Sequence, residues 1–286
     1  MTSPLTLAHS PCPNDTFVFH AWTEGLLPDA PEVRLTFADI DVTNGMAARG
    51  ELDVLKISYA ALPHVLENYA LLPCGGALGH GCGPLVLSAG PAVPAALTGA
   101  RIAVPSVSST AYLLFRLWAA EAVPDGVGEI TVLPFHEIMP AVRDGRVDAG
   151  LVIHEARFTY DRYGLHRVAD MGEEWEKRTG VPIPLGAIVA RRSLGEPLLH
   201  RIAETVRASL RVARHDPTAS RGHILEHAQE MEPDVVDQHI DLYVNEFTVD
   251  LGQDGLHAVR TLLDRSAELG LLPPLPAGAL EMTGRL

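Results

Sequence analysis

The apolar positions along the chain alternate between short, almost continuous runs and longer segments with helical spacing. Apolar runs of about four to eight residues favour buried strands, whereas apolar positions at i, i+3 and i+4 favour helices. Strands are predicted at residues 5–9, 33–40, 52–58, 83–90, 101–106, 129–135, 147–153 and 184–192. Helices are predicted at residues 16–24, 43–50, 109–122 and 137–145, and throughout most of the chain from Glu196 onward. This alternation is typical of an α/β protein.

The pattern also repeats within the chain. The segment "SPCPNDTFVFHAW" resembles "PSVSSTAYLLFRLW", and "AARGELDVLKIS" resembles "AVRDGRVDAGLVI". Two copies of a strand–helix–strand–helix–strand unit predict two lobes with mostly parallel sheets. We place the larger, discontinuous lobe at residues 1–97 and 191–286 and the smaller lobe at 98–190. The strand at 184–192 should carry the chain back to the first lobe.

Two such lobes facing each other would form a ligand cleft, because open α/β sheets bind ligands beyond the carboxyl ends of their strands. The loops at those ends carry Asn14, Asp15 and Thr16 in one lobe and Ser108, Ser109 and Thr110 in the other. Each group begins a predicted helix, where free N–H groups and the helix dipole favour an anion. The alternative is that these residues only cap their helices.

Two further strand ends carry candidate chemistry. Lys56 and Ser58 lie in the apolar run "LDVLKIS" and should share one side of the strand, with Ile57 on the other. Lys56 is either a surface amine or a cation that pairs with a ligand carboxylate. His154 follows the apolar "GLVI", and an imidazole at the end of a buried strand is well placed to move protons near neutral pH.

Two other segments have weaker signals. Phe158, Tyr160 and Tyr163 lie close together, either packing into a core or forming a flat wall for an aromatic ligand. The run "GGALGHGCGP" lacks a phosphate-binding fingerprint, and we interpret it as a flexible connection.

Composition narrows the possible functions. The formal net charge of −14 argues against nucleic acid and against an anionic membrane surface as partners. The three cysteines form no CxxC motif, which indicates reduced thiols. The N-terminal segment has no signal-peptide pattern, and the apolar runs are too short to span a bilayer, so we expect a cytoplasmic protein. No spacing of residues is typical of a metal site.

Six segments in order carry a family resemblance: "SPCPNDTF", "KISYAAL", "GGALGHGCGPLV", "SSTAYLL", "GLVIHEARFTY" and "TGVPIPLGAI". Together they resemble the 1,4-dihydroxy-6-naphthoate synthase family of the futalosine route to menaquinone. The resemblance implies a two-lobed, periplasmic-binding-protein-like (type II) fold and a carbon–carbon lyase without a cofactor. Its substrate would be cyclic dehypoxanthine futalosine, a small anionic molecule.

The resemblance also implies roles for particular residues. His154 corresponds to the family's proton acceptor, and Lys56, Ile57, Ser58, Ser109 and Thr110 correspond to its substrate-binding positions. To these the helix-terminus argument adds Asn14. Two alternatives remain open from the sequence: a chorismate dehydratase of the same pathway, and a non-catalytic protein that binds small carboxylates.

Overall fold

The computed structural model describes residues 3–228 and 232–280, and the chain divides into two compact units. The first comprises residues 1–79 and 184–286, and the second comprises residues 80–183. The predicted division at 97/98 and 190/191 is therefore displaced at both crossings. The reason is strand pairing: residues 85–88 hydrogen-bond within the sheet of the second unit, and residues 186–191 within that of the first.

The first unit contains a mixed sheet with the order β2-β1-β3-β11-β4, and β5 also pairs with β11. Its strands are β1 (Leu5–His9), β2 (Val33–Phe37), β3 (Val54–Ser58), β4 (Tyr69–Leu71), β5 (Ala77–Gly79) and β11 (Ile183–Arg191). Its helices are α1 (Pro13–Thr23), α2 (Ile40–Ala48), α7 (Glu196–His215), α8 (Pro217–His227), α9 (Pro233–Tyr243), α10 (Glu246–Val249) and α11 (Gly252–Glu268). Short 3₁₀ helices lie at Tyr59–His64 and Arg192–Leu194.

The second unit repeats this arrangement with the order β10-β6-β9-β7-β8. Its strands are β6 (Leu85–Ser88), β7 (Ile102–Val104), β8 (Ile130–Val132), β9 (Ala149–Val152) and β10 (His166–Asp170). Its helices are α3 (Thr110–Ala122), α4 (Phe135–Arg143), α5 (Ala156–Thr159) and α6 (Met171–Thr179), with 3₁₀ turns at Pro94–Leu97 and Tyr160–Tyr163. In both units a parallel triplet, β2-β1-β3 or β8-β7-β9, is extended by antiparallel strands.

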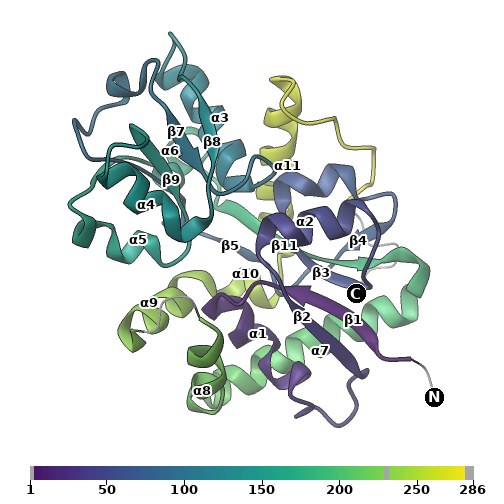
Figure 1. Ribbon diagram of the computed structural model, residues 1–286. Coiled ribbons are helices and arrows are strands. Elements are labelled where there is room, and N and C mark those ends of the chain that lie inside the picture. The colour runs from purple at the N-terminus through teal and green to yellow at the C-terminus, as the bar shows by residue number, and fades with distance from the viewer. Residues whose placement is uncertain (1–2, 229–231, 281–286) are drawn as a thin grey trace. The chain divides into compact units, whose positions relative to one another are not determined.

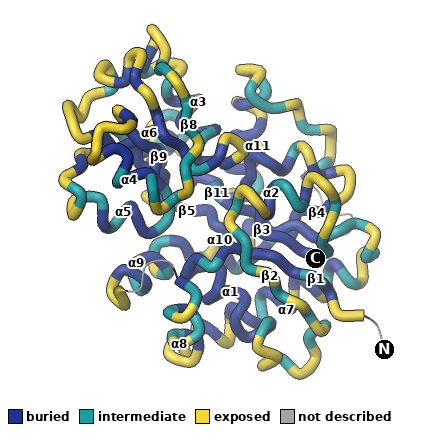
Figure 2. The backbone as a smooth tube through the Cα atoms, in the orientation of Figure 1, coloured by how far each residue is buried: buried dark blue, intermediate teal, exposed yellow. Residues whose placement is uncertain are grey.

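The sheets are thus less parallel than the sequence pattern suggests. β11 runs antiparallel to β3 and β4, and β6 runs antiparallel to β9 and β10. A strand buried on both faces is a continuous apolar run whichever way it points, so periodicity does not reveal direction. Figure 2 shows β3 and β9 in the colour of buried residues.

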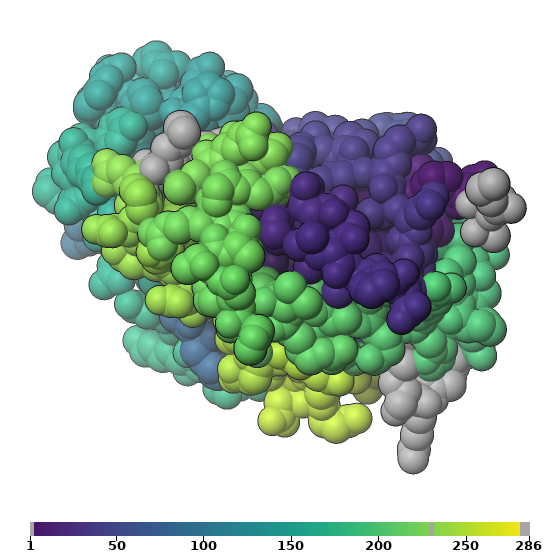
Figure 3. Space-filling view, turned by 90° about the horizontal axis from the view of Figure 1, so that it is seen from below, coloured from purple at the N-terminus to yellow at the C-terminus, as the bar shows by residue number. Residues whose placement is uncertain are grey.

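Helix α1 begins earlier than predicted and is buried on all sides. It starts at Pro13, whose ring suits the first helical position because no N–H is needed there. Residues Pro13 to Trp22 are all buried, since α1 packs against α7, α8 and α9 as well as the sheet (Figure 1). In Figure 3 the purple N-terminal segment lies directly beside the green segment that contains α7 to α9. A helix enclosed in this way has little solvent-exposed surface, which is why its apolar periodicity is weak.

Each unit has its own apolar core. In the first, Phe19, Trp22 and Ile202 belong to the cluster that joins α1, the sheet and α7. In the second, Leu87, Ile138 and Leu151 are fully or almost fully buried. Tyr160 and Tyr163 pack against this second core, which supports the packing interpretation of these two aromatic residues.

The glycine-rich run is tightly packed where it enters the second unit. A Cβ on Gly83 would lie 1.9 Å from the backbone nitrogen of Gly172, so the two backbones touch. Arg157 also donates a 2.7 Å hydrogen bond to the Gly83 carbonyl oxygen. The run contains β5 as well, so our interpretation of it as a flexible connection was wrong.

Replacing Gly83 with alanine should lower the free energy of unfolding by about 1–3 kcal/mol, because the methyl group has no room beside Gly172. Gly90→Ala is the matched control, since a Cβ there meets nothing within 4 Å. That variant should stay within about 0.5 kcal/mol of the parent chain. Urea unfolding of the three proteins measures the difference, and equal stability of the two variants would contradict the close contact.

Candidate active site

A buried ion pair lies at the start of α1 in the first unit. The Lys56 ammonium, from β3, is 2.7 Å from Oδ1 of Asp15, and both side chains are only 4% exposed. Lys56 also makes a longer contact of 3.4 Å with the Gly75 carbonyl oxygen. The first turn of α1 therefore places a carboxylate against the lysine of β3.

Asp15 has further donors around it. The Asn14 amide donates a 2.9 Å hydrogen bond to Oδ1, and the Ser10 hydroxyl donates a 2.8 Å hydrogen bond to Oδ2. Burial alone would raise the pKa of Asp15, but the charge of Lys56 and the hydrogen bonds from Lys56 and Ser10 outweigh it and lower that pKa from its ordinary value. Asp15 is therefore an anion at neutral pH.

This arrangement changes what Lys56 can offer a ligand. The sequence suggested an ammonium that pairs with a ligand carboxylate, but the chain supplies its own carboxylate at that place. The pair carries no net charge. An anion that binds here would meet a neutral group with oriented N–H and O–H donors, rather than an isolated cation.

Ser58 is held by a residue that the sequence analysis missed. Asn44, in α2, donates from Nδ2 to the Ser58 hydroxyl oxygen at 3.1 Å and accepts from the Ser58 backbone N–H at 2.8 Å. Because Asn44 is the donor to Oγ, the Ser58 hydroxyl hydrogen is left to be donated elsewhere. No local pattern identifies Asn44, which is 14 residues away in sequence. Ile57 is fully buried and pairs with Ala187 of β11.

His9 is a second missed residue, at the last position of β1. Its ring stacks on Phe19 with centroids 4.9 Å apart, and Nδ1 lies 2.7 Å from the Ser10 carbonyl oxygen. A carbonyl oxygen only accepts, so Nδ1 carries the proton. Burial lowers the pKa of His9 to about 4, and the imidazole is neutral at pH 7.

Two candidates of the second unit lie at the start of α3. Ser109 is the N-cap: its hydroxyl oxygen accepts from the Tyr112 N–H at 3.1 Å and its hydroxyl donates to the Ser106 carbonyl oxygen at 2.9 Å. The capping function considered for this residue is thus present. Thr110 is the first residue of α3, and both side chains are buried.

His154 stands two residues after β9, at the carboxyl end of that buried strand. Its φ is 53°, and it is the one non-glycine residue with a positive φ among residues 3–228 and 232–280. Its ring meets the edge of Phe135, with centroids 5.4 Å apart. A left-handed backbone disfavours most side chains, and such strain is concentrated at functional sites. The neighbouring Glu155 is buried.

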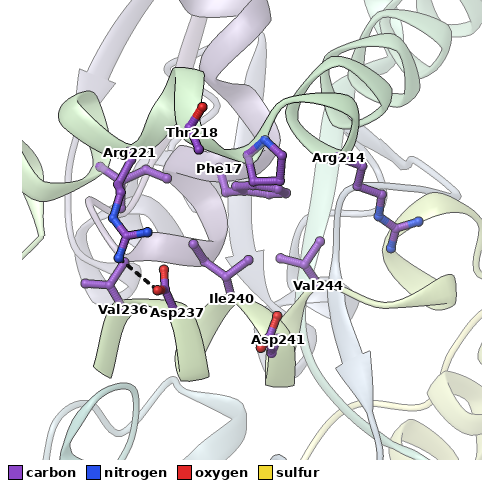
Figure 4. A pocket seen from close by; sticks show the side chains of 11 residues that line it. Phe17, Arg214, Thr218, Arg221, Val236, Asp237, Ile240, Asp241 and Val244 are labelled. Carbon is purple, nitrogen blue, oxygen red and sulfur yellow. Dashed lines mark hydrogen bonds and ion pairs between the residues drawn. The ribbon is translucent and has the colours of Figure 1, made fainter. Parts of the chain in front are cut away.

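A cavity of about 460 Å³ lies between α1, α8 and α9 in the first unit, and none of the predicted site residues lines it. Figure 4 shows Val236 and Ile240 beside it, with Arg221 paired to Asp237 at 2.8 Å. Its walls are completed by Phe17, Arg214, Pro217, Thr218, Ile224, Asp241 and Val244.

The remaining expectations concern thiols and membranes. Cys12, Cys74 and Cys82 are buried and form no disulfide, and burial raises the pKa of Cys74 and of Cys82 to about 12. Such thiols are poor nucleophiles. Among the helices of the described residues, none combines the length and the apolar character that crossing a bilayer requires.

Comparison with solved structures identifies the class of fold. A crystal structure of an Archaeoglobus fulgidus protein superposes with a TM-score of 0.87 at 30% identity, covering 94% of this chain and 98% of that one. The periplasmic aliphatic sulphonate binding protein SsuA from Escherichia coli superposes with a TM-score of 0.70 at 13% identity, covering 100% and 94%. The chain thus has the predicted periplasmic-binding-protein-like fold.

Comparison of sequences identifies the family within that class. The family profile described as "Menaquinone biosynthesis" matches residues 5–268. A Streptomyces coelicolor protein named 1,4-dihydroxy-6-naphtoate synthase is 69% identical over 276 residues, covering 96% of this chain and 97% of that protein. A Thermus thermophilus protein of the same name is 44% identical, covering 95% and 97%. The chain belongs to the 1,4-dihydroxy-6-naphthoate synthase family, whose enzymes act in menaquinone biosynthesis.

Replacing Lys56 with methionine should lower the free energy of unfolding by about 3–5 kcal/mol at pH 7, because the Asp15 carboxylate is left buried without its cation. The depressed pKa of Asp15 stabilises the parent chain at pH values above 3.8, and this stabilisation disappears as the pH falls through the lower folded-state value. In the variant, the charge and hydrogen bond of Lys56 no longer oppose burial, so we expect a higher pKa of Asp15 than in the parent chain. The difference in the free energy of unfolding between the parent chain and the Lys56→Met variant should therefore become smaller as the pH falls from 7 toward 4.

The only other lysine provides the control. Lys177 is exposed in α6, so Lys177→Met should change the free energy of unfolding by less than about 0.5 kcal/mol. If the Lys56→Met and Lys177→Met variants were equally stable at pH 7, the ion pair would contribute nothing to the free energy of unfolding.

His9 should make the fold sensitive to mild acid. Between pH 6.5 and 4 the unfolded chain binds a proton at this residue and the folded chain does not, so unfolding becomes more favourable as the pH falls. The loss should reach about 2–3 kcal/mol at pH 4.5. His9→Phe removes the titration and should lose less stability than the parent chain between pH 7 and 4.5. Chemical unfolding at both pH values measures these losses. If the parent chain and the His9→Phe variant lose the same stability, the lowered pKa of His9 is contradicted.

Proposed function

We propose that this chain converts cyclic dehypoxanthine futalosine to 1,4-dihydroxy-6-naphthoate and a sugar-derived fragment, as a carbon–carbon lyase with His154 as the general base. The observation that carries the proposal is the strained backbone of His154 at the end of a buried strand. The names of the relatives from S. coelicolor and T. thermophilus support the choice of reaction.

The other candidates bind and orient the anionic substrate in this proposal. Ser58 has a hydroxyl hydrogen to donate, since Asn44 occupies its oxygen as a donor. Ser109 has its hydroxyl hydrogen on the Ser106 carbonyl, so this residue contributes through the start of α3 rather than as a free hydroxyl donor. Asn14, Lys56, Ile57 and Thr110 complete the proposed set. The Asp15 carboxylate keeps the Lys56 ammonium in place for the substrate.

The chemistry follows from a single proton transfer. An unprotonated ring nitrogen of His154 removes a proton from the substrate, and the C–C bond to the sugar fragment then breaks. Formation of the aromatic naphthalene ring drives the cleavage, so the proposed reaction uses neither a metal nor a redox cofactor. Positioning of the base and hydrogen bonds to the developing negative charge lower the barrier.

The direct test is to incubate the purified protein with cyclic dehypoxanthine futalosine and follow the naphthoate product by absorbance and mass. We expect multiple turnovers, with and without a chelator. Consumption of chorismate instead would favour the dehydratase alternative. Tight binding of either molecule without turnover would indicate a binding protein.

His154→Asn should reduce kcat by about 10²–10⁴, the usual contribution of a general base. Asparagine tolerates a positive φ, so this variant should keep the backbone conformation while removing the imidazole. His154→Ala should lose at least as much activity, and both variants should still bind the product. His136→Asn, at an exposed position of α4, is the control and should retain full activity. A His154→Asn enzyme with nearly unchanged kcat would place the base elsewhere.

A further inference from the structure

The hydrogen-bonded residues at the start of α1 in the first unit are joined by a further hydrogen bond to α9, a helix near the C-terminal end of the chain. His239, in α9, has no exposed surface, and its Nε2 lies 2.9 Å from Oδ1 of Asn14. The two residues are 225 positions apart in sequence. His239 was not among the residues that the sequence pattern singled out, because nothing local distinguishes it from other histidines.

The hydrogen-bond directions along this network are fixed by chemistry. The Asp15 carboxylate only accepts, so the Asn14 nitrogen must face it and the Asn14 oxygen must face His239. That oxygen also only accepts, so Nε2 of His239 carries a proton and donates it. The ring of His239 is further held by Tyr243, with centroids 4.5 Å apart.

We propose that His239 is a positioning residue for substrate binding: it fixes the Asn14 amide and, through Asp15, the Lys56 ammonium. This inference rests on the proposed function of Asn14 and Lys56 as substrate-binding residues. The chain of contacts runs from His239 to Asn14 at 2.9 Å, to Asp15 at 2.9 Å and on to Lys56 at 2.7 Å. Without the first contact the amide is free to rotate, and one donor of the Asp15 carboxylate is lost.

The structure favours positioning over simple packing for a specific reason. A buried histidine that only filled space would be replaceable by a leucine of similar size. His239 instead supplies the one donor that reaches the Asn14 oxygen among the hydrogen bonds of the described residues. On the same helix, the apolar side chains of Val236 and Ile240 line the cavity shown in Figure 4.

The test compares His239→Leu with His239→Gln, because the glutamine amide nitrogen can reach the place of Nε2. His239→Leu should raise KM for cyclic dehypoxanthine futalosine about tenfold with kcat changed less than about threefold, as expected for a buried acceptor left unpaired. His239→Gln should restore KM to within about twofold of the parent enzyme. Val236→Ala, a buried change on the same helix, should lower the unfolding midpoint and leave KM unchanged.

A double-mutant cycle decides whether the effect passes through Asn14. In an Asn14→Ala background, His239→Leu should raise KM no further. The same tenfold increase in that background, or a failure of glutamine to rescue, would overturn the inference while leaving the lyase activity intact. A parent enzyme without turnover would instead contradict the proposed function. In that case the unfolding midpoints of the two single variants and the double variant measure whether His239 and Asn14 are coupled. If the midpoint shifts are additive, the hydrogen bond between the two residues contributes nothing and the inference is wrong.

Discussion

The buried ion pair between Lys56 and Asp15 is the constraint around which the first unit is arranged. Two opposite charges can be this deeply buried only if their geometry is good and their other hydrogen-bonding atoms are satisfied. The amide of Asn14 and the hydroxyl of Ser10 meet that demand at Asp15. The two prolines around Cys12 restrict the turn from β1 into α1, and Pro13 allows α1 to begin at once, with Asn14 and Asp15 in its first turn. The polar residues at the start of α1 therefore hold a carboxylate of the chain itself.

The two units hold their candidate residues by different means. In the first, hydrogen bonds in two separate sets hold the side chains: one set runs from α9 through α1 to Lys56 of β3, and the other joins Asn44 of α2 to Ser58 of β3. In the second, His154 is placed by an unfavourable backbone conformation at the end of β9, and Ser109 by its own cap of α3. A network can be altered at a distance from the substrate, whereas a strained turn depends on the packing directly around it.

Much of the fold follows from local pattern, and much of the site does not. The strand runs, the repeat and the return of the chain through residues 184–192 are visible because apolar periodicity is a local property. The directions of β6 and β11 are not, because a strand buried on both faces looks the same either way. His154 could be found because it ends an apolar run. The partners Asp15 and Lys56, or Asn44 and Ser58, could not be paired from sequence, since only the folded sheet brings them together.

The position of β11 has a consequence for how the chain is made. This strand lies between β3 and β4, yet it is synthesised only after the whole second unit. Residues 80–183 contain all strands of their own sheet and can fold as they leave the ribosome. The emerging first unit must meanwhile keep β3 as an open, apolar edge, which is a surface prone to wrong pairing. Growing chains that stall before residue 191 should therefore be the ones that depend most on chaperones.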